Sequence, residues 1–180
     1  MGYTTDFNGE FKLDKPLTPE HEAYLIAFAH SRHMERNATI TGTMPDPVRE
    51  AAGLPLGDQA QYFVGASEIN MGQDETSDVL DANRPPNGVP SLWCQWIPEV
   101  RYVQGEDQKG KPADCIAWDG GEKFYEYIDW IKYIIVHFLD TWGYVVDGEV
   151  KWVGEDSNDL GKIVIKNSIV TVKHGTVTYD

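Results

Sequence analysis

The most regular pattern of hydrophobic and polar positions lies between residues 124 and 138. Its apolar residues are separated by four, three, four and three positions, which is the spacing of one face of an α-helix. The sequence therefore predicts an amphipathic helix here. Its apolar stripe consists of Phe124, Ile128, Ile131, Ile135 and Phe138.

The four residues Asp119, Gly120, Gly121 and Glu122 precede this helix and allow two interpretations. In the first, they form a capping box, in which Asp119 accepts from an amide of the first turn and Glu122 reaches back to the amide of Asp119. In the second, the two glycines expose amides that bind a phosphate. The two carboxylates would repel a phosphate, so the capping interpretation is favoured.

A second helix is predicted after Thr18, which suits the N-cap position because Pro19, with no amide hydrogen to satisfy, follows it in the first helical position. This helix is expected to extend to about Asn37. Its predicted buried stripe consists of Tyr24, Leu25, Phe28 and Ala29.

Alternating patterns and turn residues predict strands around these helices. Residues 3–14 are expected to form a strand or a short hairpin around Asn8-Gly9, and two further strands are expected at 91–103 and 115–119. After residue 143 the chain is predicted to be a meander, with a last strand at 176–179. The turns of this meander are predicted at Asp147-Gly148, at residues 155–161 and at Asn167-Ser168.

The predicted elements follow the order strand, helix, two strands, helix and several strands. This order favours an α+β fold, with an antiparallel sheet and two helices packed on one face. The specific prediction is a ferredoxin-like core with an extended C-terminal β-meander. The chain of 180 residues is expected to form a single domain, residues 1–180.

The segment from residue 38 to residue 91 lacks clear periodicity and is interpreted as an irregular, insertion-like part of this domain. A short helix is expected after Asp46-Pro47, and residues 61–65 are expected to form a short strand. So long a stretch without regular structure is unusual in a small domain. It indicates either a functional surface or elements that the pattern does not reveal.

The chain is acidic, with 15 Lys and Arg against 29 Asp and Glu and a formal net charge of -14. This charge repels a phosphate backbone unless the basic residues gather on one face, so direct nucleic-acid binding is not expected. The negative charge would instead be consistent with an acidic surface that binds a basic partner. Acidity that serves only solubility is the alternative.

Cysteine content and apolar runs bear on location. Two cysteines, Cys94 and Cys115, are too few for a disulfide scaffold, and residues 1–11 lack the basic and apolar regions of a signal peptide. No apolar run reaches the roughly 20 residues that cross a bilayer. The sequence therefore predicts a cytoplasmic protein without membrane insertion.

Two arginines and three of the six tryptophans are the candidate ligand contacts. Arg32 and Arg36 are four positions apart on the predicted first helix. They could bind an anion, or they could only stabilise the C-terminal end of the helix through its dipole. Most tryptophans are expected in the core, but one or two left exposed could stack on a base or anchor a partner. The candidates are Trp93, Trp96 and Trp118.

No catalytic or metal-binding motif stands out. The chain has no GxSxG, P-loop, GxGxxG or HExxH pattern, and neither cysteine lies in a context that lowers its pKa. His30 and His33 lie three positions apart without a recognised set of further ligands. Residues 154–161 match a calcium loop in composition but not in spacing. No metal or cofactor is predicted, and enzymatic activity is unsupported.

Four segments of the chain carry a resemblance: YTTDFNGEFKLDKPLTPEH, GQDETSDVLDANRPPNGVPSLWCQW, WDGGEKFYEYIDWIKYII and GEVKWVGEDSNDLGKIVIKN. Together they resemble a family of uncharacterised small bacteriophage and prophage proteins, over nearly the whole chain. The family has no assigned activity, so the resemblance implies no catalytic residues. It implies an accessory protein in the cytoplasm of an infected host, and many such proteins modulate host enzymes or antiviral defences.

The leading hypothesis is a non-enzymatic interaction protein that binds a host or defence protein through an acidic surface, with residues 38–91 as a candidate contact. The alternative is a nucleotide-binding protein, in which tryptophans form the pocket and Arg32 or Arg36 meets phosphate. A third hypothesis is a hydrolase whose acidic groups bind a metal. The sequence leaves the oligomeric state open.

Overall fold

The computed structural model of the chain describes residues 2–65 and 76–178. The chain falls into two compact units. The sheet unit comprises residues 1–17 and 95–180, and the inserted unit comprises residues 18–94, which stand in sequence between two strands of the sheet unit. The prediction of a single domain with an insertion-like segment at 38–91 stays a prediction.

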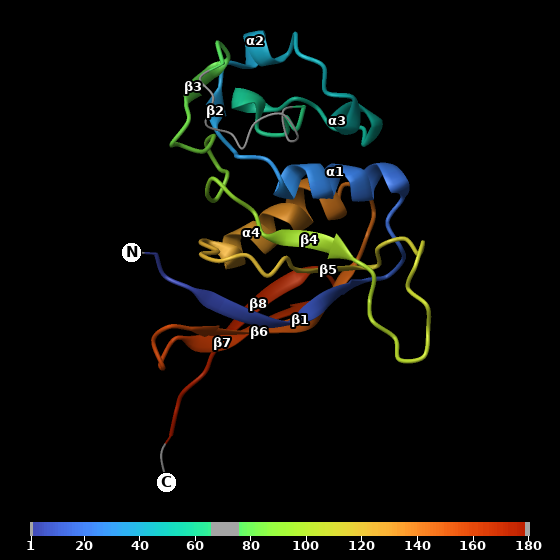
Figure 1. Cartoon of the computed structure of the whole chain (residues 1–180), viewed down its shortest axis with the longest axis vertical. Coiled ribbons are helices and arrows are strands. Elements are labelled where there is room, and N and C mark those ends of the chain that lie inside the picture. The colour runs from blue at the N-terminus through green and yellow to red at the C-terminus, as the bar shows by residue number, and fades with distance from the viewer. Residues whose placement is uncertain (1, 66–75, 179–180) are drawn as a thin grey trace. The chain divides into compact units, whose positions relative to one another are not determined.

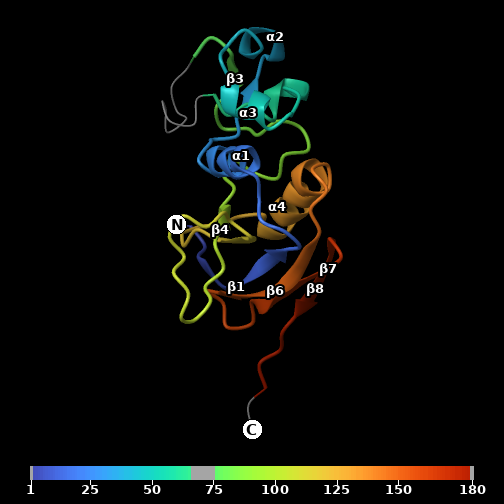
Figure 2. The ribbon, with the colours of Figure 1, turned by 90° about the vertical axis from the view of Figure 1, so that its right-hand side faces the viewer.

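The sheet unit contains a six-stranded antiparallel sheet with the strand order β4-β5-β1-β6-β7-β8. One helix, α4 (Tyr127–Ile134), continues into the π-helical turn η2 (Ile135–Leu139). Figure 1 and Figure 2 show this helix over one face of the sheet, which we call the inner face. The predicted α+β fold with an antiparallel sheet is confirmed. The strands are β1 (Thr5–Leu13), β4 (Trp96–Glu99), β5 (Cys115–Trp118), β6 (Val146–Gly154), β7 (Leu160–Lys166) and β8 (Ile169–His174).

The core of the sheet unit lies between α4 and the inner face. Alternate positions of the central strands point inward, as a half-buried sheet requires. The buried side chains from these strands include Phe11, Val150, Trp152, Ile163 and Ile165. The helical segment contributes buried side chains at three positions of the predicted stripe, Ile131, Ile135 and Phe138.

The helix does not begin where the sequence predicts it. Lys123 and Glu126 have left-handed φ angles of 61° and 55°, so the helix begins only at Tyr127, and the predicted capping box is wrong. The carboxylate of Asp119 instead accepts a hydrogen bond from the amide of Gly121 at 2.7 Å, which closes a local turn.

Two glycines that are predicted to lie in turns lie inside long strands. Strands β1 and β6 continue through Gly9 and Gly148 and pair with each other along their whole length. A Cβ atom on Gly9 would collide with the carbonyl oxygen of Glu149, and one on Gly148 would collide with that of Glu10. The glycines therefore permit a close approach of two strands instead of reversing the chain.

Two predicted C-terminal turns are confirmed. Residues 155–159 join β6 to β7, and Asn167-Ser168 joins β7 to β8 with left-handed φ angles of 48° and 62°, as a tight hairpin turn requires. The predicted strand at 91–103 is confined to β4. The predicted strand at 176–179 is absent at residues 176–178, and residue 179 lies outside the described residues.

The inserted unit consists mainly of short elements. Its longest helix, α1 (Pro19–Ala29), is capped by the Thr18 side chain, which accepts from the amide of His21 at 3.3 Å. The start and the buried stripe of α1 are confirmed, but its end is not. The other elements are β2 (Glu35–Arg36), α2 (Ala38–Thr41), α3 (Pro47–Ala51), η1 (Asp58–Ala60) and β3 (Val79–Asp81), with β2 and β3 paired.

Local hydrogen bonds explain why α1 stops before Asn37. The Ser31 hydroxyl donates to the carbonyl of Ala27 at 2.7 Å, and Asn37 caps α2 by accepting from two amides of its first turn. The helix predicted after Asp46-Pro47 forms as α3, whereas the strand predicted at residues 61–65 does not form. Because α1 belongs to the inserted unit, the packing of two helices on one face of the sheet stays a prediction.

Within the described parts of the chain, no helix is both long enough and apolar enough to cross a membrane.

Candidate functional site

The two candidate tryptophans of the sheet unit lie opposite each other in the strand register. Trp96 on β4 pairs with Trp118 on β5, and the ring of Phe7 contacts both indoles edge-on, with centroids 5.4 Å and 5.3 Å away. The indole nitrogen of Trp96 donates to the carbonyl of Tyr127 at 2.8 Å, and Trp96 is buried. Trp118 is half-buried and donates to the Gln95 side chain at 3.0 Å. This pair packs as part of the core.

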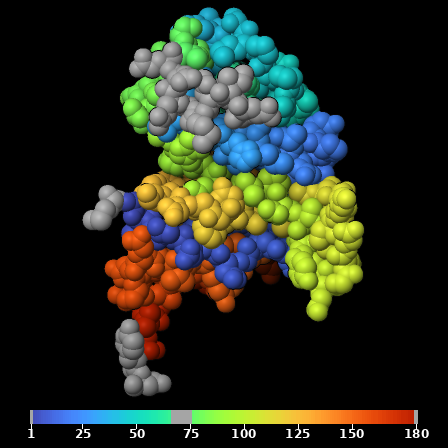
Figure 3. All heavy atoms as spheres, in the orientation of Figure 1, coloured from blue at the N-terminus to red at the C-terminus, as the bar shows by residue number. Residues whose placement is uncertain are grey.

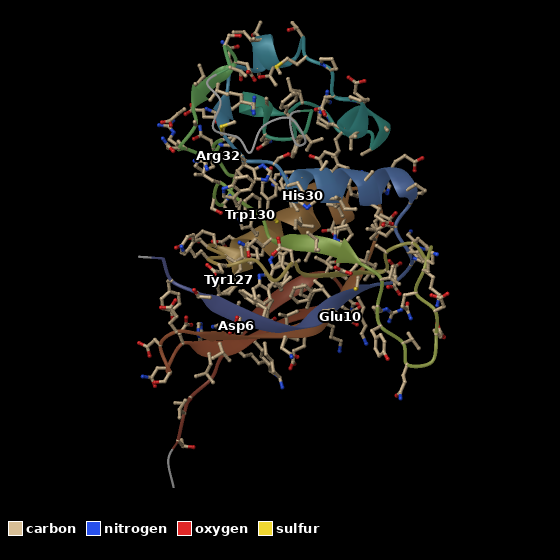
Figure 4. The ribbon with its side chains drawn as sticks, in the orientation of Figure 1. Asp6, Glu10, His30, Arg32, Tyr127 and Trp130 are labelled. Atoms are coloured by element: carbon tan, nitrogen blue, oxygen red, sulfur yellow. The ribbon has the colours of Figure 1, made fainter. Side chains whose placement is uncertain are left out.

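The two candidate arginines lie in the inserted unit and make structural contacts. Since α1 ends at Ala29, they do not share a helical face, which corrects the sequence prediction. Arg36 is buried and forms an ion pair with Asp78 at 2.5 Å. Arg32, labelled in Figure 4, donates to the carbonyl of Ala82 at 2.9 Å and to the side chain of Asn83 at 3.1 Å. Both guanidinium groups are therefore engaged by the protein.

Trp93 is half-buried in the inserted unit, so the five candidate residues are divided between the two units. An apolar groove of about 310 Å³ in the inserted unit offers no aromatic side chain for stacking on a base. It is lined by Pro19, Glu20, Ala23, Pro47, Val48 and Ala51.

A different group of residues forms the best candidate site, at the turn between β6 and β7. The Tyr3 hydroxyl donates to Asp159 Oδ2 at 2.7 Å, and the indole nitrogen of Trp152 donates to Asp159 Oδ1 at 2.9 Å. The Tyr3 hydroxyl also accepts from the amide of Asp156 at 3.1 Å. We call this group, with two neighbouring tyrosines and one further acid, the acidic aromatic cluster. Its members are Tyr3, Tyr125, Tyr127, Trp152, Glu155, Asp156 and Asp159.

The N-terminal segment fixes the cluster by bonding across the turn. The amide of Thr4 donates to Glu155 Oε1 at 2.7 Å, and the amide of Tyr3 donates to the Tyr125 hydroxyl at 3.4 Å. Within the turn, Asp156 accepts from the amide of Asn158 at 2.9 Å, a contact that shapes acidic turns. The geometry of the site therefore depends on both the N-terminal segment and the turn at 155–159.

The three acids of the cluster have no basic partner among the residues that the structure describes. Within that part of the chain, Glu155, Asp156 and Asp159 make no ion pair with a lysine or arginine. Burial, together with the charge of Asp159 and the nearby Tyr3, raises the pKa of Tyr127 to about 12. The Tyr127 hydroxyl therefore stays protonated near neutral pH.

The aromatic side chains of the cluster are partly open to solvent. Tyr3 is 38% exposed and Tyr125 is 48% exposed, while Tyr127, labelled in Figure 4 at the start of α4, is half-buried. A cationic side chain can lie over an exposed tyrosine ring while it donates to a neighbouring carboxylate. The arrangement is therefore suited to binding an arginine or lysine.

The cysteines show no sign of nucleophilic activation. Both are buried thiols that are not joined in a disulfide, and the Cys115 thiol donates to the carbonyl of Glu99 at 3.2 Å. Burial and the nearby carboxylates of Glu10, Asp114 and Glu99 raise the pKa of Cys115 to about 12, so the reactive thiolate is suppressed. Within the described ranges, no group of three or more His, Cys, Asp or Glu side chains is placed to hold a metal ion.

The sequence gives only part of the signal for this site. The acidic turn at 154–161 stands out in the sequence, but its pairing with Tyr3, more than 150 positions away, has no local signature.

Comparison of the chain with protein-family models, with curated proteins and with solved structures found no match.

Proposed function

We propose that this chain is a non-enzymatic interaction protein that binds a basic segment of a partner protein at the acidic aromatic cluster. The observation that carries the proposal is the placement of three unneutralised acids, Glu155, Asp156 and Asp159, beside exposed tyrosine rings. The net charge of -14 adds a long-range attraction for a basic partner.

We further propose the setting that the family resemblance implies. The chain acts as a phage or prophage accessory protein in the host cytoplasm, and the partner is a host or antiviral-defence protein. A basic partner is favoured over a nucleic acid because the same carboxylates that attract arginine repel phosphate.

The fold proposal is a ferredoxin-like core that β7 and β8 extend. It is supported by the strand order β6-β1-β5-β4, in which the first and third strands of a βαββαβ motif are central and the fourth and second flank them. An experimental structure tests it: α1 is expected beside α4 on the inner face. A position of α1 away from that face would contradict the proposal.

Binding of a fluorescent arginine-rich peptide tests whether the cluster is a local site. We expect the charge reversals Glu155→Lys and Asp156→Lys together to weaken binding by about tenfold or more, roughly 1.4 kcal/mol. Tyr125→Ala should weaken it further, because the exposed ring is lost. Added salt should reduce the affinity.

The matched control places the same charge change outside the cluster. Asp107 lies in the loop between β4 and β5, which projects as a lobe in the space-filling view (Figure 3). Two reversals at that loop, Asp107→Lys and Glu106→Lys, should change the affinity less than about twofold. If they weaken binding as much as the cluster variants, net charge alone explains the binding and the local site is rejected.

A further inference from the structure

The hairpin of β7 and β8 differs in charge from the rest of the chain. Residues 160–178 contain three lysines and one histidine but no aspartate or glutamate, in a chain that has 29 acids. An acid-free stretch of this length is therefore a local basic region in an acidic protein. The structure shows where its lysines lie.

Three lysines form a transverse row on the outer face of the sheet, the face opposite α4. In the strand register, Lys151 on β6 lies opposite Lys162 on β7, and Lys162 lies opposite Lys173 on β8. Like charges placed directly opposite in a sheet are destabilising. We call this set the lysine row.

The middle lysine of the row is paired with a carboxylate. Lys162 donates to Glu149 Oε2 at 2.7 Å, and this bond, with the charges of Lys151 and Lys173, lowers the pKa of Glu149 below its ordinary value. Among the residues described, Lys151 and Lys173 make no ion pair of their own. The row therefore retains an excess of positive charge that ends at the edge strand.

The edge beside Lys173 is open for pairing. Strand β8 is the last in the sheet, and the amide of Gly175 donates to the carbonyl of Leu160 on β7 at 2.7 Å. In an antiparallel pair, backbone groups alternate between the two sides. Ile169, Thr171 and Lys173 therefore direct theirs toward β7. The outward backbone groups belong to Val170, Val172 and His174.

The two edges of the sheet differ in their protection. Strand β4, at one edge, has only four residues and contains Pro98, which has no amide hydrogen to donate. Strand β8, at the other, has six residues, no proline and a 70% exposed Ile169. An edge with outward backbone groups and β-branched residues is a template for an added strand, and Lys173 disfavours a strand that would bring another positive charge beside it.

We propose that β8 accepts an extended acidic segment of a partner protein as a seventh strand. Backbone hydrogen bonds to Val170, Val172 and His174 hold the segment, as in strand addition elsewhere. Its side chains alternate: an acidic residue on the outer face completes the row beside Lys173, and an apolar residue on the inner face packs beside Val172.

Charge selects this occupant over two others. A second copy paired through β8 would bring together two hairpins that each carry three lysines and no acid. A nucleic acid would find no aromatic ring for stacking on the outer face of β7 and β8, and the carboxylate of Glu149, which is bonded to Lys162, would repel its phosphates. An acidic strand matches both the free backbone groups and the charge.

Two synthetic peptides test the proposal with the full chain. One alternates valine with glutamate, and the other alternates valine with lysine at the same length. We expect fluorescence anisotropy to show binding of the glutamate peptide at least about tenfold tighter than that of the lysine peptide. Lys173→Glu should remove this preference, whereas Lys12→Glu on the outer face of β1 should preserve it. Equal binding of both peptides would overturn the proposal.

The backbone contribution is tested separately. Val172→Pro should fold, because an edge strand tolerates proline where the amide points outward. It removes one outward amide and should weaken binding of the glutamate peptide by about tenfold. Amide hydrogen exchange on the unmodified chain decides the point if this variant does not fold. Addition of the peptide should slow exchange at Val170, Val172 and His174 and leave Thr171 unchanged.

Two further outcomes would contradict the choice of partner. Analytical ultracentrifugation that shows a dimer, lost in Val172→Pro, would assign the edge to a second copy. Oligothymidine that competes with the glutamate peptide would assign the row to nucleic acid. The cluster variant with Glu155→Lys and Asp156→Lys should bind the glutamate peptide as the unmodified chain does, so this test is independent of the proposed function.

Discussion

The sheet unit and the inserted unit are stabilised by different kinds of contact. In the sheet unit, strands of up to nine residues place apolar and aromatic side chains against α4. In the described part of the inserted unit, every element other than α1 has five residues or fewer. Among the residues described, all buried polar and charged side chains other than Thr5 lie in the inserted unit: Ser31, His33, Arg36, Thr41, Asp46 and Asp78.

This difference follows from where backbone groups find their partners. A strand ladder satisfies them internally, so the sheet unit can bury mainly apolar side chains. Short segments leave amides and carbonyls that side chains must satisfy. Asp46 accepts from the amide of Val64 at 3.3 Å, and Arg49 donates to the carbonyl of Leu54 at 2.7 Å. The two units should therefore respond differently to substitution and to pH.

The largest expected effect is a cavity in the core of the sheet unit. Phe11 is fully buried and its ring contacts Trp96 edge-on at 5.3 Å. Phe11→Ala should lower the free energy of unfolding by about 4 kcal/mol, through lost burial and a residual cavity. Urea unfolding followed by circular dichroism measures it. Val153→Ala, at a 56% exposed position, is the control and should stay within about 0.5 kcal/mol.

The next effect breaks the buried ion pair of the inserted unit. Asp78 accepts from Arg36 at 2.5 Å and from Thr41 at 3.0 Å, and the guanidinium lies 5.0 Å from the ring centre of Phe63. Asp78→Ala leaves a buried cation unpaired and should cost about 3 kcal/mol, the lower end of the usual range because the Phe63 ring remains. Urea unfolding again gives the value.

The matched control for Asp78 is an ion pair at the surface. Arg84 pairs with Glu35 at 3.0 Å, and its side chain is 61% exposed. Arg84→Ala should cost less than about 1 kcal/mol, since water screens such a pair. Equal losses for Asp78→Ala and Arg84→Ala would mean that the buried network does not stabilise the inserted unit.

The response to pH should separate two buried carboxylates of the inserted unit. Burial raises the pKa of Asp46 above 3.8, and the bonds from Arg49 and Val64 only partly offset this. Burial acts on Asp78 in the same direction, but hydrogen bonds from Thr76, Arg36 and Thr41 hold its pKa below 3.8. The two groups therefore contribute with opposite sign.

The sign of each contribution gives a measurable contrast. The stabilisation from Asp78 is present above pH 3.8 and is lost as the pH falls through its folded pKa. The cost of ionising Asp46 is present above its raised pKa and is relieved as the pH falls toward 3.8. As the pH is lowered, the stability of the unmodified chain should fall relative to Asp78→Asn and rise relative to Asp46→Asn. Parallel curves would contradict the assignment.

The sequence predicts correctly those helix starts and turns whose geometry depends only on neighbouring residues. Thr18 and Pro19 start α1, and Asn167-Ser168 turns the last hairpin, because cap and turn geometry depend on neighbouring residues. The same logic predicts turns at Gly9 and Gly148, yet both lie in strands. Their environment is set by β1 and β6, which lie more than 130 positions apart in the chain.

The candidate site shows the same limit more strongly. The turn at 155–159 is recognisable as acidic, but its partner Tyr3 comes from the N-terminal segment, and Tyr3 in turn bonds Tyr125 near the start of α4. The sequence pattern makes Arg32 and Arg36 candidates because it predicts a helix that continues past Ala29, where α1 in fact ends. In the structure, Arg32 instead bonds the carbonyl of Ala82 and Arg36 bonds the carboxylate of Asp78. These partners lie more than 40 positions away, so no spacing of residues in the sequence predicts the contacts.

The smallest expected effect compares one polar side chain from each unit. Thr18 caps an eleven-residue helix in the inserted unit, whereas Asp119 closes an exposed turn in the sheet unit. Thr18→Ala should cost about 1 kcal/mol. Asp119→Ala should cost less than half of that, because no helix begins at this turn. Urea unfolding of both variants under one set of conditions makes the comparison.

The ranking of these two variants bears directly on the helix start. Thr18→Ser keeps a hydroxyl that can accept from the amide of His21, so it should restore most of the loss and show that the cap, not side-chain size, matters. If Asp119→Ala cost as much as Thr18→Ala, a helix would begin near Gly120 in solution. The left-handed φ angles of Lys123 and Glu126 exclude that start, because a right-handed helix cannot continue through residues with positive φ.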